Sequence, residues 1–159
     1  MNTIGQSINL PLLSIPLYYV LAIYPHGYAV ILGGQGNLKR HDNRNPRSTS
    51  HIDSLKRRLT KAEYARWERA ESCHRNHLEN MSLFVAAVFA GLLAEQKVGK
   101  GAVGLNEFVV GWLVIRLLYT INYLATETIR WSYFRSLLYF VGSFWAFYIF
   151  GNAALIIGS

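Results

Sequence analysis

The sequence contains a single cysteine, Cys73, which excludes an internal disulfide. Charged side chains are missing from residues 1–38 and again from residues 136–159. Each of these uncharged stretches can supply the apolar length that crosses a bilayer, which argues against a soluble domain. The first stretch also lacks the basic residues that open a cleaved signal peptide, so we expect it to remain in the protein. A Gly-rich phosphate-binding loop is also missing.

Four segments have enough apolar residues to span a membrane, for which roughly 20 are needed. They lie at about residues 10–32, 67–94, 105–126 and 135–157. The second is polar in its first half, and the third contains Glu107 and Arg116. The sequence therefore predicts an all-α, multi-pass integral membrane protein built as a four-helix bundle.

The positive charge is concentrated between the first two predicted spans. Nine of the sixteen Lys and Arg residues fall within residues 33–66, in a chain whose net charge is +7. Because basic loops stay on the cytoplasmic side, we predict that residues 33–66 form a basic cytoplasmic loop. The connection predicted at residues 126–134 shares that side. Membrane lipids are expected partners of such a surface, and nucleic acid is not.

Polar residues recur on one face of the second span and on one face of the third. Helical spacing of about 100° per residue aligns them. The two sets are Arg69, Ser72, Asn76 and Glu79, and Trp112, Arg116, Tyr119, Thr120, Tyr123 and Glu127. A charge at bilayer depth costs roughly 2.5–3.5 kcal/mol, so these faces are expected to meet each other or a partner subunit around a polar cavity. Alternatively, Arg116 pairs with Glu79 or Glu127 only to hold the bundle together.

Two further polar features are interpreted structurally. Arg75 and Glu79 are four residues apart, which predicts an ion pair on the helix surface. His74 and His77 are three apart and no acidic residues complete a convincing ligand set, so no metal site is expected. His26 is interpreted as a polar packing residue of the first span.

The stretch RAESCHRNHLENMSLFVAA, residues 69–87, resembles the second helix of the MAPEG family, the membrane-associated proteins in eicosanoid and glutathione metabolism. That helix typically has the pattern R-A-Q-R-A-H-x-N-x-L-E-N before an apolar run. The matching residues are Arg69, Ala70, His74, Asn76, Leu78, Glu79 and Asn80. Those similar to the third-helix pattern R-x-x-Y-T-x-x-Y-L are Arg116, Tyr119, Thr120, Tyr123 and Leu124. Arg135-Ser136-Leu137 resembles the R-S-L that opens the fourth helix, and the resemblance covers about residues 67–157.

The resemblance implies that residues 1–159 form one MAPEG-like membrane domain, which assembles as a homotrimer in the endoplasmic reticulum. It also implies that glutathione binds between subunits on the cytoplasmic side. The residues implied as cofactor-binding are Asn76, Glu79, Arg116 and Tyr119, and those implied as catalytic are Arg135 and Tyr123. Arg75 is added as a cofactor-binding candidate because of its own position, as explained below. Arg135 is expected to face the thiol and favour the thiolate, since a guanidinium lowers a thiol pKa from about 8.5.

Two departures from the family pattern affect this transfer. Ser72 stands where the family usually has a second arginine, so a charge expected to bind a glutathione carboxylate is missing there. Arg75, three residues along, is the candidate replacement. The predicted connection between the third and fourth spans is also longer than the family pattern, which makes Arg130 an alternative to Arg135 as the active arginine.

Three functions fit these observations. The first is a transferase or isomerase that uses glutathione on a lipophilic electrophile. The second is a glutathione-independent isomerase or cyclase that uses the same cavity for acid-base chemistry on a lipophilic metabolite, and Ser72 motivates it. The third is a non-catalytic membrane protein that presents lipids.

Overall fold

The structure is a computed structural model that describes residues 8–159, so the first seven residues of the predicted 1–159 domain lie outside the described part. The helices are α1 (Leu10–Gly34), α2 (Thr49–Arg58), α3 (Lys61–Val98), α4 (Leu105–Ala125) and α5 (Ile129–Gly158), with a 3-10 turn at Leu38–Arg40. Residues 8–159 contain no strand. α1, α3, α4 and α5 are each long and apolar enough to cross a membrane. The predictions of an all-α class and of four long apolar helices are therefore confirmed.

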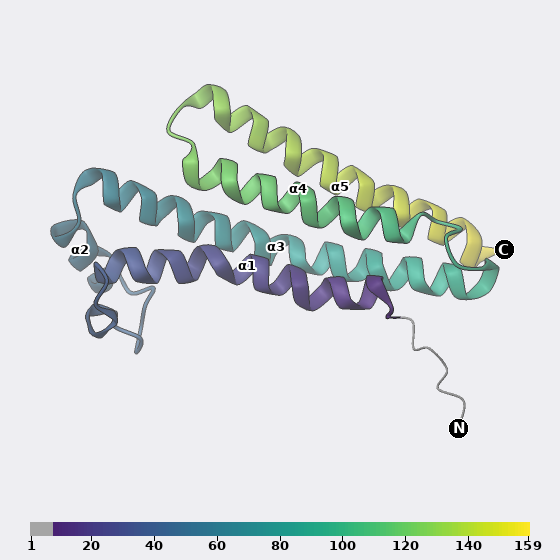
Figure 1. Cartoon of the computed structure of the whole chain (residues 1–159), viewed down its shortest axis with the longest axis horizontal. Coiled ribbons are helices and arrows are strands. Elements are labelled where there is room, and N and C mark those ends of the chain that lie inside the picture. The colour runs from purple at the N-terminus through teal and green to yellow at the C-terminus, as the bar shows by residue number, and fades with distance from the viewer. Residues whose placement is uncertain (1–7) are drawn as a thin grey trace.

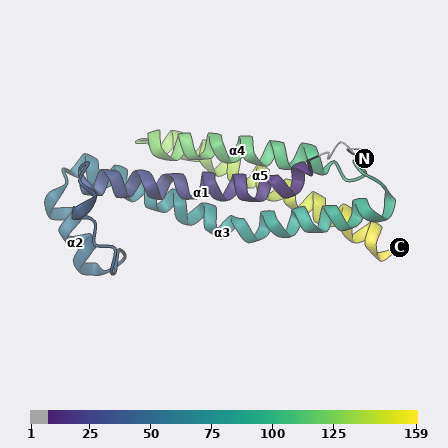
Figure 2. The ribbon, with the colours of Figure 1, turned by 60° about the horizontal axis from the view of Figure 1, so that its bottom comes forward.

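The four long helices run side by side, with α3 in contact with each of the other three. Figure 1 shows α2 and the connection between α4 and α5 at one end of the bundle. The carboxyl terminus and the connection between α3 and α4 lie at the opposite end (Figures 1 and 2). We call the end that carries α2 the basic end.

α3 is longer than the span predicted for it. It begins at Lys61, where Thr60 and Glu63 form a capping box. The Glu63 backbone N–H donates to Thr60 Oγ1 at 3.3 Å, and the Thr60 backbone N–H donates to Glu63 Oε2 at 2.8 Å. Thirty-eight residues at 1.5 Å each give a helix of about 57 Å, well beyond a hydrocarbon core of about 30 Å. The first turns of α3 therefore project from the bilayer at the basic end.

Two predicted connections are wrong in extent. Residues 33–66 are not only loop, because α2 forms within them. Ser48 caps α2 by accepting a hydrogen bond from the His51 backbone N–H at 3.2 Å, and the buried side chains of His51 and Leu55 are four residues apart on one face. The connection predicted at residues 126–134 is shorter, because α5 already begins at Ile129.

A cluster of buried aromatic rings joins three of the long helices. Tyr18 from α1, Phe84 from α3 and Trp112 from α4 are fully buried. The Tyr18 and Phe84 ring centroids are 5.1 Å apart, and the Phe84 and Trp112 centroids are also 5.1 Å apart. Such pairs contribute about 0.5–1.5 kcal/mol each beyond their buried area. This cluster fixes the height at which the polar residues of α3 and α4 face each other.

α4 and α5 approach closely at Gly111. A Cβ atom added there would overlap Cζ3 and Cη2 of Trp145. The space that a side chain would fill is thus taken by an indole ring, which also packs edge-on against Phe108 with centroids 6.0 Å apart. Because glycine has no side chain, α4 and α5 can approach each other closely at Trp145.

We predict that Gly111→Ala lowers the melting temperature in detergent, because overpacking of this kind costs about 1–3 kcal/mol. The matched control is Gly151→Ala in α5, where an added Cβ meets nothing within 4 Å. Alanine favours helix over glycine, so the control should leave the melting temperature unchanged or raise it. Equal melting temperatures for Gly111→Ala and wild type would contradict this packing.

Candidate functional site

Arg116 is a charged side chain buried inside the bundle. It is 1% exposed, and its Nη1 donates a hydrogen bond to Oδ1 of Asn76 on α3 at 3.0 Å. Its Cζ lies 4.8 Å from the Trp112 ring centroid and 5.3 Å from that of Tyr119. Aromatic faces attract a desolvated guanidinium by about 2 kcal/mol. Within residues 8–159, Arg116 Nε and Nη2 have no hydrogen-bond partner.

This contact decides how the two predicted polar faces relate. Arg116 and Asn76 bring them together within a single protomer, as one of the two predicted arrangements requires. A second contact joins Arg69 Nη2 to Glu127 Oε1 at 3.5 Å. Arg116 makes no ion pair with Glu79 or Glu127 in the described part of the chain, so the ion pairs predicted in the alternative do not form.

His77 and Thr120 extend the polar contact between α3 and α4. The Thr120 hydroxyl donates to the Arg116 backbone carbonyl at 2.8 Å, so its proton is already used. His77 Nε2, 2.8 Å from Thr120 Oγ1, must therefore carry a hydrogen and donate it. Tyr18 from α1 donates to the His77 backbone carbonyl at 3.1 Å. This network holds the backbone of α3 and α4 in register beside Arg116.

Arg135 lies on the first turns of α5 and faces the same region. Its Cζ is 3.9 Å from the ring centroid of Tyr123, and the Tyr123 and Tyr119 rings are 5.5 Å apart. A hollow of about 240 Å³ opens here, which we call the arginine hollow. It is lined by Asn76, Tyr119, Arg135, Ser136, Tyr139 and Phe140. Arg130 is an exposed residue on the first turn of α5 and does not line this hollow.

The structure contradicts the ion pair predicted between Arg75 and Glu79. Within residues 8–159 their side chains form no salt bridge, and Arg75 Nη2 instead donates to Ser72 Oγ at 3.3 Å. The Arg75 guanidinium thus lies beside the residue that replaces the expected arginine. Arg75 and Glu79 are both exposed on the protomer, on a face of α3 that α1, α4 and α5 leave uncovered.

α1 contributes a pairing that spacing within one helix could not have shown. His26 Nδ1 lies 2.7 Å from Glu71 Oε1 on α3, so His26 is more than a packing residue. His74 is buried, and its Nδ1 lies 2.8 Å from the Ala22 backbone carbonyl. His26 and Glu71 are far apart in sequence, and only the packing of α1 on α3 brings them together. No cluster of three or more His, Cys, Asp or Glu residues suited to a metal ion occurs in residues 8–159.

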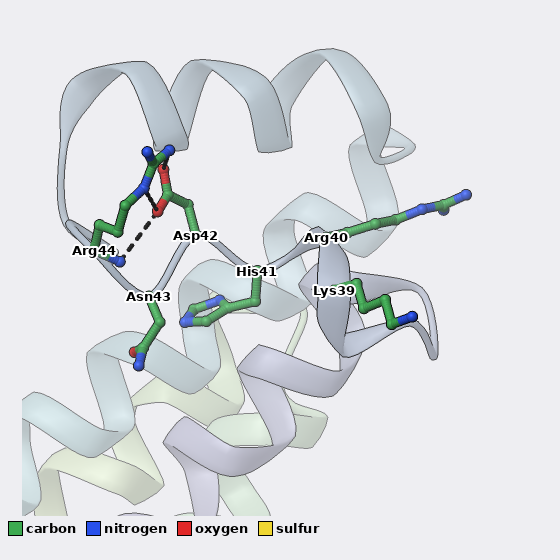
Figure 3. Close-up of a pocket in the computed structure, with 6 residues that line it drawn as sticks. All are labelled: Lys39, Arg40, His41, Asp42, Asn43 and Arg44. Carbon is green, nitrogen blue, oxygen red and sulfur yellow. Dashed lines mark hydrogen bonds and ion pairs between the residues drawn. The ribbon is translucent and has the colours of Figure 1, made fainter.

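A larger hollow of about 510 Å³ lies in the connection between α1 and α2. Figure 3 shows its lining, in which Arg44 turns onto Asp42. Asp42 Oδ1 accepts from Arg44 Nε at 3.0 Å and from the Arg44 backbone N–H at 3.1 Å. These hydrogen bonds hold the pKa of the Asp42 carboxyl below its ordinary value. Because this carboxylate already has its partner and the hollow is open, it is a weaker candidate than the arginine hollow.

Comparison with known proteins identifies one family. The model described as MAPEG family matches residues 8–155 of the 159-residue chain, which includes all four long helices except the last residues of α5. Neither the curated proteins nor the solved structures gave a match.

We predict that Thr120→Val lowers the free energy of unfolding by about 1–3 kcal/mol, because it leaves the buried His77 Nε2–H without an acceptor. Valine keeps the shape of threonine, so the change removes the hydroxyl and little else. Ser143→Ala is the control, since the Ser143 hydroxyl bonds only the Tyr139 backbone carbonyl within its own helix. Thermal unfolding in detergent measures both, and an equal effect of the two substitutions would contradict the network.

Proposed function

The chain belongs to the MAPEG family, and from this premise we propose that it is a membrane-embedded enzyme that uses glutathione to conjugate or isomerise a lipophilic small molecule. We further propose that it acts as a homotrimer of the endoplasmic reticulum, with sites between subunits.

The observation that carries the proposal is that Arg116 contacts Asn76 and Tyr119, two residues that line the same hollow as Arg135. Arg116 is buried with Nε and Nη2 unpartnered in the described residues, and Arg135 lines the adjoining hollow. A buried donor without an acceptor costs about 1–3 kcal/mol, and more when charged, so an anionic ligand would stabilise this arrangement. Glutathione fits the residues present, because it carries two carboxylates, an amine and peptide groups.

Arg75 supports glutathione binding despite Ser72. Its guanidinium hydrogen-bonds to the Ser72 hydroxyl, which returns a positive charge to the place where the family pattern has arginine. Arg75 is therefore proposed to bind a glutathione carboxylate, and Glu79 to bind the amine.

The uncovered face of α3 supports assembly. Arg75 and Glu79 are exposed on it. Two apolar side chains of the same helix are also exposed, Leu78 at 37% and Phe89, further along α3, at 50%. Apolar and charged side chains on one face of a helix that crosses a bilayer favour a protein neighbour over lipid. A second copy of the chain packed there would complete the wall of the arginine hollow.

When bound, glutathione supplies a thiol, whose ionised form is the reactive nucleophile. The chain contributes a fixed positive charge, because the Arg135 guanidinium stays protonated at any physiological pH. The Tyr123 ring lies under that guanidinium and holds it in place. Arg135 is therefore proposed to favour the negative charge on which the reaction depends.

A separate apolar hollow supports a lipophilic substrate. It measures about 420 Å³ and lies where α4 ends and α5 begins, at the same end as Arg135. Its lining includes Leu118, Ile121, Trp131 and Phe134. A substrate dissolved in the bilayer can reach such a surface without crossing water.

A glutathione-independent isomerase or cyclase is the second candidate, and Ser72 favours it. With no arginine at that position, the hollow could instead use Tyr119, Tyr123 and Arg135 on a membrane-dissolved metabolite. Turnover without added thiol would identify this function, and strict thiol dependence would exclude it.

We predict that Arg135→Ala abolishes the ultraviolet absorbance of bound thiolate and lowers thiol-dependent turnover by at least about 100-fold, as expected for a lost charge at a reacting centre. Arg130→Ala is the matched control, because Arg130 lies five residues earlier on the same helix, is exposed and does not line the arginine hollow, and this variant should retain both signals. If Arg130→Ala removes the thiolate band and Arg135→Ala does not, the active arginine has been assigned wrongly.

We predict that millimolar glutathione raises the melting temperature of the wild type, because a ligand that binds only the folded protein stabilises it. Arg75→Gln should require about tenfold more glutathione for the same rise in melting temperature, since hydrogen bonds to charged groups contribute about 1.5–3 kcal/mol. Arg66→Gln on the same helix is the control and should respond as wild type. A wild type that glutathione does not stabilise would argue for the second candidate.

A further inference from the structure

A hollow of about 430 Å³ lies between α3 and the segment that contains α2, and it shares no lining residue with the arginine hollow. We call it the boundary hollow. It is lined by Pro46, Arg47, Ile52, Lys56, Tyr64, Trp67, Glu68, Glu71 and Arg75. It combines three basic side chains with two aromatic rings, and apart from Arg75 none of these residues has a role in the proposed reaction.

The height of this hollow along α3 follows from helix geometry. Glu95 closes the uncharged stretch of α3 at the far end, and Arg75 lies 20 residues before it, about 30 Å along the axis. With Glu95 at one edge of a hydrocarbon core of about 30 Å, Arg75 lies at the other edge, and Glu79, about 6 Å inside that edge, is the one Asp, Glu, Lys or Arg residue between them. Trp67 lies eight residues further, about 12 Å beyond Arg75. The boundary hollow therefore spans the depth of the lipid headgroups.

The aromatic pair fits that depth. The Tyr64 and Trp67 rings are stacked with centroids 5.6 Å apart. Trp67 packs against the end of α1, where its Cδ1 would lie 3.4 Å from a Cβ added at Gly33. Tyr and Trp concentrate at membrane interfaces because one part of the ring system is apolar and another donates hydrogen bonds.

The basic side chains of the hollow are available to an anion. Within residues 8–159, Arg47 and Lys56 form no salt bridge with an acidic side chain, in contrast to Arg44, which pairs with Asp42. Lys56 Nζ instead lies 5.7 Å from the Tyr64 ring centroid. Both are exposed, and further basic residues of α2 and of the preceding turn add to the positive field. A phosphate group between Arg47 and Lys56 would gain two charge-assisted contacts.

The acidic residues of the boundary hollow indicate which type of lipid headgroup fits it. Glu71 is occupied by His26 at 2.7 Å, which leaves Glu68 as the carboxylate without an ion-pair partner in the described residues. A carboxylate accepts hydrogen bonds, so Glu68 suits a headgroup whose phosphate carries a hydroxylated substituent.

From these observations we propose that the boundary hollow binds the headgroup of an anionic phospholipid, with its phosphodiester between Arg47 and Lys56 and its hydroxyl groups toward Glu68. The acyl chains of the lipid then lie along the bilayer beside α1 and α3. The site holds a lipid of the leaflet at the basic end and fixes the position of α2 against α3.

The test is a titration of the full chain in detergent with phosphatidylglycerol, monitored by thermal unfolding. The variant R47Q/K56Q removes the two cations of the hollow. The variant K39Q/R57Q removes one lysine and one arginine that are exposed on the same basic segment and do not line the hollow, so the change in net charge is the same. Phosphatidylcholine and glycerol 3-phosphate are titrated in parallel. Neither double variant touches a residue of the arginine hollow.

We expect phosphatidylglycerol to stabilise wild type and K39Q/R57Q, with apparent affinity weakened roughly tenfold to thirtyfold in R47Q/K56Q. Phosphatidylcholine should have little effect. An equal loss of affinity in both double variants would show that only the general charge of the segment attracts lipid, and would overturn the site. A response to glycerol 3-phosphate equal to that of the lipid would assign the hollow to a soluble phosphate and also overturn it. These outcomes are independent of whether glutathione binds.

Discussion

The buried guanidinium of Arg116 is the constraint on which the rest of the bundle depends. A charge buried among apolar side chains is costly, and the chain compensates with the Asn76 amide oxygen and with the rings of Trp112 and Tyr119. To supply both, α3 and α4 must be held in one register. Two contacts between these helices hold that register, one on each side of Arg116. They are the aromatic cluster around Phe84 and the contact of His77 with Thr120.

The same constraint links the fold to the proposed chemistry. Asn76 satisfies one nitrogen of Arg116, while Nε and Nη2 have no partner within the described residues. A protein that needed Arg116 only for cohesion could have placed an acidic residue against it, as Arg69 and Glu127 are placed against each other. An incompletely satisfied arginine behind a hollow that a second arginine, Arg135, lines is an arrangement suited to an anionic ligand.

At the basic end, α3 extends from an apolar environment into a polar one. α3 continues well past the depth of the bilayer, so its apolar half lies in the membrane while its first turns support α2 and the boundary hollow. Arg75 lies where these two regions meet, hydrogen-bonded to Ser72 and bordering the boundary hollow. Ligand binding in the arginine hollow and lipid contact at the headgroups are therefore adjacent in space.

The sequence by itself determined the all-α class, the four long apolar helices and the family, because runs of apolar residues and the pattern around Asn76 and Glu79 are local properties. Helical spacing also predicted a contact between the polar faces of α3 and α4, which the structure shows for Asn76 with Arg116 and for Arg69 with Glu127, whereas Glu79 is exposed. Three predictions from the sequence were wrong: the ion pair of Arg75 with Glu79, the absence of a helix where α2 forms, and the residue at which α5 begins. Only the tertiary structure decided that Arg75 contacts Ser72, that His26 meets Glu71 and that Arg116 keeps two unpartnered nitrogens, because each depends on which helices pack together and at what height.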